Sequence, residues 1–201
     1  MEITTLLAQE FKLKPVHVGN IVSLIDEGNT IPFIARYRKE MTGSCDDQVL
    51  RELSDRLTYL RNLEKRREEV KESITAQEKM TDELSRAIDN AATLAEVEDL
   101  YRPYRPKRRT RATIAREKGL GPLAEILMAQ DIREGTPEEL AAPFADSEKG
   151  VASREEALQG AMDIIAEDIS DDAECRKLLR ALMFREGRLV SKAAAEEKSV
   201  Y

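Results

Sequence analysis

The chain has 201 residues, of which 41% are hydrophobic and 35% charged, and its formal net charge is −7 at pH 7. Aromatic residues make up 4% and tryptophan is absent, a composition that argues against a β-sandwich or β-barrel and predicts an all-α protein. The N-terminus lacks the basic start and apolar run of a signal peptide, and no uncharged stretch approaches the roughly 20 residues that cross a bilayer. We therefore expect a cytoplasmic protein without a membrane partner.

The first 43 residues predict three short helices joined by tight connections. Apolar residues at helical spacing indicate a helix over residues 4–12 and a second that begins at Pro15 and ends at Gly28. A third helix is expected over residues 30–43, with Thr30 as its N-cap and Gly43 at its end. This succession predicts a helix-turn-helix-like N-terminal part.

The longest predicted helix begins at Asp46 or Asp47 and runs to about Lys79. A leucine stripe follows one face of its first half, whereas the middle of the segment is almost wholly charged. Such a helix is about 50 Å long, and its polar middle cannot be buried on all sides. We therefore expect this helix, over about residues 46–79, to project from two packed bodies or to bridge between them.

Two helix starts follow closely, at Thr81 and at Thr93, and the second has the capping-box pattern of Thr93 with Glu96. They predict an antiparallel return along the long helix. Further helices are expected over residues 113–118, 122–130, 137–144, 153–169, 171–185 and 186–201. The last has no stop signal, so we expect a chain cut from a longer protein, the alternative being a frayed natural terminus. The elements predict a multi-helix bundle with an N-terminal helical region over residues 1–110 and a second helical region over residues 111–201.

Residues 102–118 oppose the charge of the rest of the chain. They hold one acidic residue, Glu117, and eight basic residues, which are Arg102, Arg105, Lys107, Arg108, Arg109, Arg111, Arg116 and Lys118. This basic segment therefore carries +7, which leaves −14 to the remainder. Tyr104 is interleaved with these charges, and two prolines stiffen the backbone. Such a segment is typical of a surface that faces phosphates or an acidic partner, and the alternative is a solvated loop that pairs with the protein's own carboxylates.

Residues suited to catalysis are few. His17 is the single histidine and lies in the first turn of a predicted helix, where we expect a surface or capping residue. Cys45 and Cys175 lack the spacing of a metal site or a disulfide framework, so we expect reduced thiols. The carboxylates lie in helical charge runs, and the sequence has no phosphate-binding loop and no EF-hand pattern. We therefore expect no enzymatic activity, no metal and no cofactor.

Two passages resemble the bacterial Tex family of transcription accessory proteins. One is residues 31–43, Ile-Pro-Phe-Ile-Ala-Arg-Tyr-Arg-Lys-Glu-Met-Thr-Gly, and the other is residues 100–119, which contain the basic segment. The resemblance runs from about Glu2 to the end of the chain. It implies that the full-length protein continues into an RNase H-like domain without evident catalytic function, a helix-hairpin-helix module and a C-terminal S1 domain that binds RNA. It also implies kinship with the eukaryotic elongation-factor and histone-chaperone family.

Two functions remain open for this chain. The first is a non-catalytic module that binds single-stranded RNA or DNA weakly in transcription. Its candidate contacts are Arg102, Tyr104, Arg105, Lys107, Arg108, Arg109 and Arg111, with a second patch at Arg36, Arg38 and Lys39. The second is a scaffold that positions downstream domains and docks the basic segment on an acidic face of the same protein or of the transcription machinery, while the S1 domain binds nucleic acid. Guanidinium groups fanned into solvent would favour the first function, and guanidinium groups packed on carboxylates of the long helix would favour the second.

Overall fold

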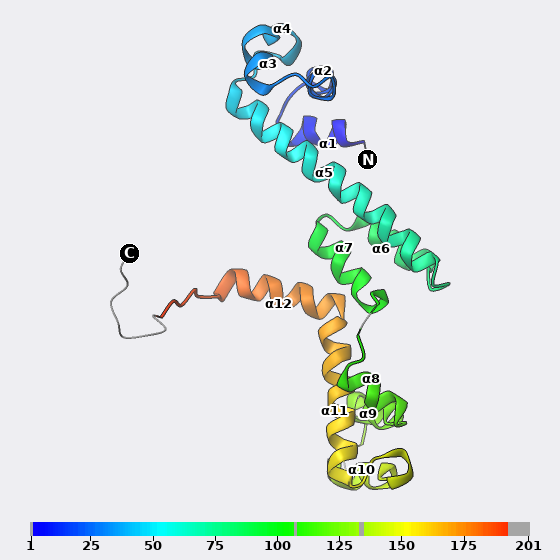
Figure 1. The fold of residues 1–201 in the computed structure, drawn as a ribbon. Coiled ribbons are helices and arrows are strands. Elements are labelled where there is room, and N and C mark those ends of the chain that lie inside the picture. The colour runs from blue at the N-terminus through cyan, green and yellow to red at the C-terminus, as the bar shows by residue number, and fades with distance from the viewer. Residues whose placement is uncertain (1, 107, 133–134, 193–201) are drawn as a thin grey trace, which may run out of the picture. The chain divides into compact units, whose positions relative to one another are not determined.

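The computed structural model describes residues 2–106, 108–132 and 135–192, and Figure 1 shows its course. This part of the chain contains twelve α-helices and three short 3-10 helices. Within the same residues no strand occurs, and the β structure is limited to an isolated bridge between Asp146 and Val151. The prediction of an all-α fold is therefore confirmed. None of the helices in the described ranges combines the length and apolarity that a membrane crossing requires.

Two compact units make up the chain, Met1–Val97 and Glu98–Tyr201. The domain division expected at residue 110 stays a prediction. The helices of the first unit are α1 (Ile3–Glu10), α2 (Pro15–Asp26), α3 (Ile31–Tyr37), α4 (Lys39–Thr42), α5 (Asp47–Thr75) and α6 (Asp82–Asn90). Helix α7 (Leu94–Tyr101) begins in the first unit and ends in the second.

Four short helices open the first unit, and apolar residues of α1, α2 and α3 form one core with the first half of α5. Helices α1 and α2 confirm the first two predicted helices. The predicted third helix is divided into α3 and α4 at Arg38, whose backbone leaves the helical region (φ −129°, ψ 25°). Thr30 occupies the N-cap position of α3, as expected, but its side chain accepts no capping hydrogen bond. Gly43 follows α4 in the left-handed conformation (φ 69°), which glycine adopts without a steric penalty.

Helix α5 bridges two groups of helices within the first unit, as its charged middle predicts (Figure 1). Asp46 caps its start by accepting a hydrogen bond from the backbone N–H of Val49 at 2.8 Å. Its leucine stripe packs on the short helices, and Val70 and Ile74 are buried in its second half. The helix ends at Thr75, a little before the predicted end.

Helices α6 and α7 confirm the two predicted helix starts, and their chain returns antiparallel to α5. Lys71 of α5 pairs with Asp89 near the end of α6. Further on, the backbone N–H of Leu94 donates to the hydroxyl of Tyr59, which lies earlier in α5. Later residues of the returning chain therefore contact earlier residues of α5, as expected for antiparallel segments.

The second unit is built around α11. Its helices are α8 (Arg111–Glu117), α9 (Gly121–Ala129), α10 (Pro137–Ala141), α11 (Arg154–Asp171) and α12 (Ala173–Glu186), with 3-10 turns η1 (Arg102–Tyr104), η2 (Ala142–Phe144) and η3 (Ser147–Lys149). The helix predicted over residues 186–201 is wrong for residues 187–192, which are not helical, and residues 193–201 lie outside the described part. Gly187 ends α12 with an extended backbone (ψ 140°), because glycine is a poor helix former.

Helices α8 and α11 approach each other closely because small residues meet between them. Ala112 and Ala115 of α8 are buried in one core with Ala157 and Ala161 of α11. Gly160 of α11 lies at the same contact. An added Cβ there would lie 2.4 Å from Cδ1 of Leu120 and 3.3 Å from Cβ of Ala115, so a side chain at position 160 displaces the Leu120 side chain and crowds the contact with Ala115.

We expect Gly160→Val to lower the free energy of unfolding of the second unit by about 1–3 kcal/mol, because a larger side chain overpacks this contact. Chemical denaturation followed by circular dichroism measures the change. Gly19→Ala in α2 is the matched control: a Cβ there meets nothing within 4 Å, so the substitution should raise stability by about 0.5–1 kcal/mol through helix propensity. Equal effects at both positions would contradict this account of the α8–α11 contact.

Candidate nucleic-acid interface

The basic segment runs from η1 through an extended stretch into α8. Thr110 begins α8, and its hydroxyl oxygen accepts a hydrogen bond from the backbone N–H of Thr113 at 3.0 Å. The same hydroxyl donates to Oε1 of Glu167 at 2.9 Å. Because Glu167 belongs to α11, this bond holds the segment along the C-terminal half of that helix.

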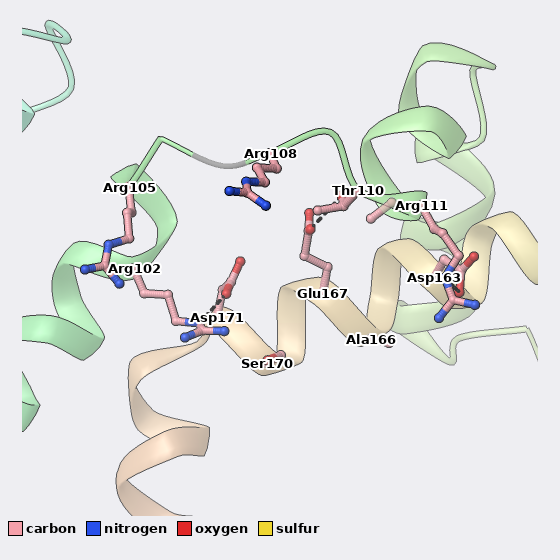
Figure 2. A pocket seen from close by; sticks show the side chains of 11 residues that line it. Arg102, Arg105, Arg108, Thr110, Arg111, Asp163, Ala166, Glu167, Ser170 and Asp171 are labelled. Atoms are coloured by element: carbon pink, nitrogen blue, oxygen red, sulfur yellow. Dashed lines mark hydrogen bonds and ion pairs between the residues drawn. The ribbon is translucent and has the colours of Figure 1, made fainter.

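A hollow of about 570 Å³ lies between the segment and α11, and Figure 2 shows the side chains that line it. The residues that line it include four predicted site residues, which are Arg102, Arg105, Arg108 and Arg111. Three carboxylates of α11 line the same hollow, those of Asp163, Glu167 and Asp171. The structure therefore brings four predicted arginines together, but three carboxylates offset most of their charge. A phosphate that enters the hollow has to compete with these carboxylates for the guanidinium groups.

Ion pairs join the segment to α11 along most of its C-terminal half. They are Arg102–Asp171 at 2.7 Å, Arg111–Asp163 at 3.8 Å and Arg116–Asp168 at 2.5 Å. Two of these aspartates lie in the last turn of α11, where the helix dipole disfavours negative charge. The arginines therefore offset both the carboxylates and the helix terminus. Among the described residues these three carboxylates come from α11 and not from the long helix α5.

Other cations of the segment are more exposed. The Arg105 side chain is 61% exposed, and its nearest carboxylate oxygen, on Glu98, is 3.9 Å away. Arg109 pairs with Glu117 at 2.6 Å, and both side chains are exposed. Arg108 is exposed and makes no ion pair or hydrogen bond with any residue in the described ranges (Figure 2). Tyr104 is half-buried in η1, and Lys107 lies outside the described residues.

A buried carboxylate fixes α12 to α7. The Asp99 side chain is 6% exposed and accepts hydrogen bonds from Nε of Arg176, at 2.6 Å, and from Arg180. Burial raises the pKa of Asp99, but the hydrogen bonds and charges of the two guanidinium groups outweigh it and leave the pKa below its ordinary value. Arg176 and Arg180 lie four residues apart, so one face of α12 points toward Asp99.

The second predicted patch belongs to the first unit. Its members, Arg36, Arg38 and Lys39, are all exposed. The Arg38 guanidinium lies over the ring of Phe33, 5.2 Å from its centroid, and the Arg36 guanidinium lies 5.9 Å from the centroid of Tyr37. The patch lines a separate hollow of about 650 Å³ together with two glutamates. This hollow is therefore also of mixed charge, and the guanidinium groups of two of its arginines lie near aromatic rings.

His17 acts as a cap, in line with the expectation from its position. Its Nδ1 donates to the backbone carbonyl of Met41 at 3.1 Å, since a carbonyl can only accept, and the amide of Asn20 donates to the same oxygen at 3.0 Å. A Cβ at Gly43 would lie 2.9 Å from Cδ2 of His17. The imidazole therefore packs against the turn at the end of α4. Among the described residues no group of three His, Cys, Asp or Glu side chains is placed to hold a metal ion.

The sequence reasoning missed the acidic partners on α11. Asp163, Glu167 and Asp171 recur every four residues, a spacing that places them on one helix face. This periodicity is visible in the sequence and could have identified an acidic stripe. Nothing in the sequence indicates that Asp99, Arg176 and Arg180 meet, because 77 residues separate the first two along the chain.

The chain matches two family models, described as Tex-like protein N-terminal domain over residues 1–75 and Tex central region-like over residues 133–200. It is 43% identical to the transcriptional accessory protein Tex of Neisseria gonorrhoeae over 190 residues and 47% identical to the protein tex of Bordetella pertussis over 186 residues. These alignments cover 94% and 92% of this chain but only 24% and 23% of the relatives. A human S1 RNA-binding domain-containing protein 1 is 30% identical over 90% of this chain and 18% of its own length. The chain thus spans about a quarter of the length of these bacterial relatives.

We expect acid to loosen α12, because the stabilising contribution of Asp99 depends on its charge. A carboxylate with a depressed pKa contributes fully above the ordinary value of about 3.9, and the contribution is lost as the pH falls through the lower pKa of the folded state. Hydrogen-exchange protection factors of α12 should therefore fall as the pH is lowered below about 4.

Asp99→Asn should weaken α12 already at pH 7, by about 2 kcal/mol, because two charge-assisted hydrogen bonds are lost. Asp131→Asn is the control, since this exposed carboxylate has no hydrogen bond or ion pair within the described residues. An unchanged α12 in the Asp99 variant would contradict the role of the carboxylate.

Proposed function

Because this chain carries the N-terminal and central regions of the Tex family and is homologous to bacterial Tex proteins over most of its length, we propose that it is a non-catalytic helical scaffold of a transcription accessory protein. In this proposal the chain acts in the cytoplasm without metal or cofactor. Its partners are downstream domains of the same protein and the transcription machinery. Residues 1–110 and 111–201 are the proposed domains.

One observation carries the proposal. Among the described residues, most cations of the basic segment form ion pairs with carboxylates of the same unit. Arg102, Arg111 and Arg116 pair with α11, and Arg109 pairs with Glu117. Lys118 donates to a backbone carbonyl at 2.6 Å. A segment whose cations already have partners stabilises its own fold, and it binds a phosphate backbone only at the cost of those contacts.

Nucleic-acid binding is the second candidate, and the exposed arginines favour it. Arg105 and Arg108 line the hollow, and neither has a carboxylate within 3.5 Å among the described residues. Tyr104 precedes them and is suited to stack on an unpaired base. A relative of this chain is named for an S1 RNA-binding domain, which is consistent with RNA as a ligand of the longer protein. This candidate keeps Arg109, Lys107 and the patch of Arg36, Arg38 and Lys39 as further contacts.

The scaffold proposal is tested by removing the paired arginines. Combined Arg102→Ala, Arg111→Ala and Arg116→Ala should lower the free energy of unfolding by about 2 kcal/mol, because carboxylates of α11 lose their partners. Chemical denaturation measures the loss. A triple variant as stable as the parent would contradict the scaffold role of the segment.

The nucleic-acid candidate is tested at Arg105, whose ion pair with Glu98 is 3.9 Å long, and at Arg108, which pairs with no described residue. Combined Arg105→Ala and Arg108→Ala should change stability by less than about 0.5 kcal/mol, because these side chains hold no close partner. Fluorescence anisotropy with a labelled single-stranded RNA of about 12 nucleotides reads out binding at two salt concentrations. If the parent binds and this variant loses affinity, with the salt slope reduced by roughly 0.7 per lost contact, nucleic-acid binding replaces the scaffold as the function of the segment. Negligible binding by the parent would remove the second candidate.

A further inference from the structure

Three carboxylates of α11 form one acidic face, and the basic segment lies along it. Asp163, Glu167 and Asp171 are spaced four residues apart, so at 1.5 Å per residue they follow one another along the helix axis at intervals of about 6 Å. Each meets the segment at a different point, and the contacts are Arg111–Asp163, Thr110–Glu167 and Arg102–Asp171. The segment therefore runs antiparallel to this half of α11, with one contact at each carboxylate of the acidic face (Figure 2).

The two sides of these contacts differ in their access to solvent. The Asp163 and Asp171 side chains are 18% and 12% exposed, whereas those of their partners Arg111 and Arg102 are 85% and 43% exposed. The carboxylates are therefore part of the wall of the hollow, and the guanidinium groups lie on its open side. Because an arginine side chain has several rotatable bonds, these guanidinium groups can turn toward another anion while the carboxylates stay in place.

The acidic face neutralises charge that a phosphate backbone would otherwise meet. With four arginines and three carboxylates in its lining, the hollow has a net charge of +1. A phosphate that took Arg102 from Asp171 would break a charge-assisted hydrogen bond of 2.7 Å to a shielded carboxylate. That carboxylate lies in the last turn of α11, where the helix dipole disfavours negative charge. A phosphate backbone that binds unpaired cations meets no such cost.

We propose that the acidic face of α11 is an internal competitor of single-stranded nucleic acid, which occupies arginines of the basic segment and keeps the affinity of this chain for single strands low. The competition presupposes the second candidate function, nucleic-acid binding by the segment, and regulates that same site. The two candidate functions are then two states of one segment. Paired with α11, it stabilises the second unit; released from the acidic face, Arg102 and Arg111 bind phosphates beside Arg105 and Arg108, which are already in solvent.

Removing the charge of the acidic face tests the proposal. The neutral-face variant combines Asp163→Asn, Glu167→Gln and Asp171→Asn, which keep the size of each side chain. Fluorescence anisotropy with the labelled single-stranded RNA of about 12 nucleotides compares this variant with the parent at two salt concentrations. We expect an affinity about tenfold higher than that of the parent. The salt slope should be steeper by roughly 1.4, because each of the two released arginines adds about 0.7.

Two control variants separate the release of arginines from a general change in charge. Combined Asp131→Asn, Glu138→Gln and Glu148→Gln change the net charge of the second unit by the same amount. The side chains at these exposed positions make no hydrogen bond or ion pair within the described residues, so the affinity should stay within about twofold of the parent. Arg102→Ala and Arg111→Ala, added to the neutral-face variant, should remove its gain in affinity.

Glu167→Gln alone keeps the test decisive if the neutral-face variant unfolds. The amide oxygen of glutamine accepts the hydrogen bond of Thr110 as the carboxylate does, so circular dichroism should show the helical signal of the parent. Its affinity for the RNA should be about threefold higher than that of the parent, because one competing charge is removed.

Equal affinities of the parent, the neutral-face variant and the Glu167→Gln variant would overturn the proposal, and a parent that itself binds the RNA would then still support the second candidate function. An equal gain in the Asp131, Glu138 and Glu148 variant would also overturn it, because the overall charge would then be the cause. A gain that persists without Arg102 and Arg111 would show that these arginines are not the released contacts, with the same consequence. A parent without binding and a neutral-face variant that binds would support the competition and leave the scaffold as the function of the unaltered chain.

Discussion

The close packing of α8 on α11 is the constraint on which the second unit depends. It depends on Gly160 and the alanines around it, which leave little side-chain volume between the helices. The same contact draws the basic segment, which leads directly into α8, along the acidic half of α11. Packing of small residues thus places opposite charges side by side, and the hydrogen bond from Thr110 to Glu167 sets the register between them.

The electrostatics of the segment follow from this placement. In isolation a run of arginines would be a strong phosphate site, since unpaired cations and released counterions provide the affinity. Against α11 the same arginines divide into two classes. Arg102 and Arg116 satisfy carboxylates at a helix terminus that disfavours negative charge, whereas Arg105 and Arg108 remain in solvent at the edge of the hollow. The first class stabilises the fold, and the second is available to a ligand.

Ion pairs serve a comparable purpose at both ends of the chain. In the first unit, Arg56 and Arg61 of α5 bind Glu10 and Asp26 at 2.7 Å each, beside the buried leucine stripe. Those ion pairs lie beside the hydrophobic core of the first unit, which already holds its helices together. Helix α12 differs, because it buries no side chain and is held to the fold through the guanidinium groups around Asp99. Polar contacts therefore set the orientation of α12, and its leucines stay exposed within the described part of the second unit.

The sequence by itself determined the helical class, the position of the long helix, the returning pair of helices and the local reversal of charge. These depend on the spacing of apolar residues and on capping residues within a few positions of each other, as at Asp46 and Thr93. The four-residue spacing of Asp163, Glu167 and Asp171 also indicates an acidic helix face, which the sequence analysis did not identify. Only the tertiary structure decided which carboxylates pair with which arginines, that Arg38 divides a predicted helix, and that the leucines of α12 stay exposed. Those outcomes depend on contacts between residues far apart in the chain, and no local pattern encodes such distances.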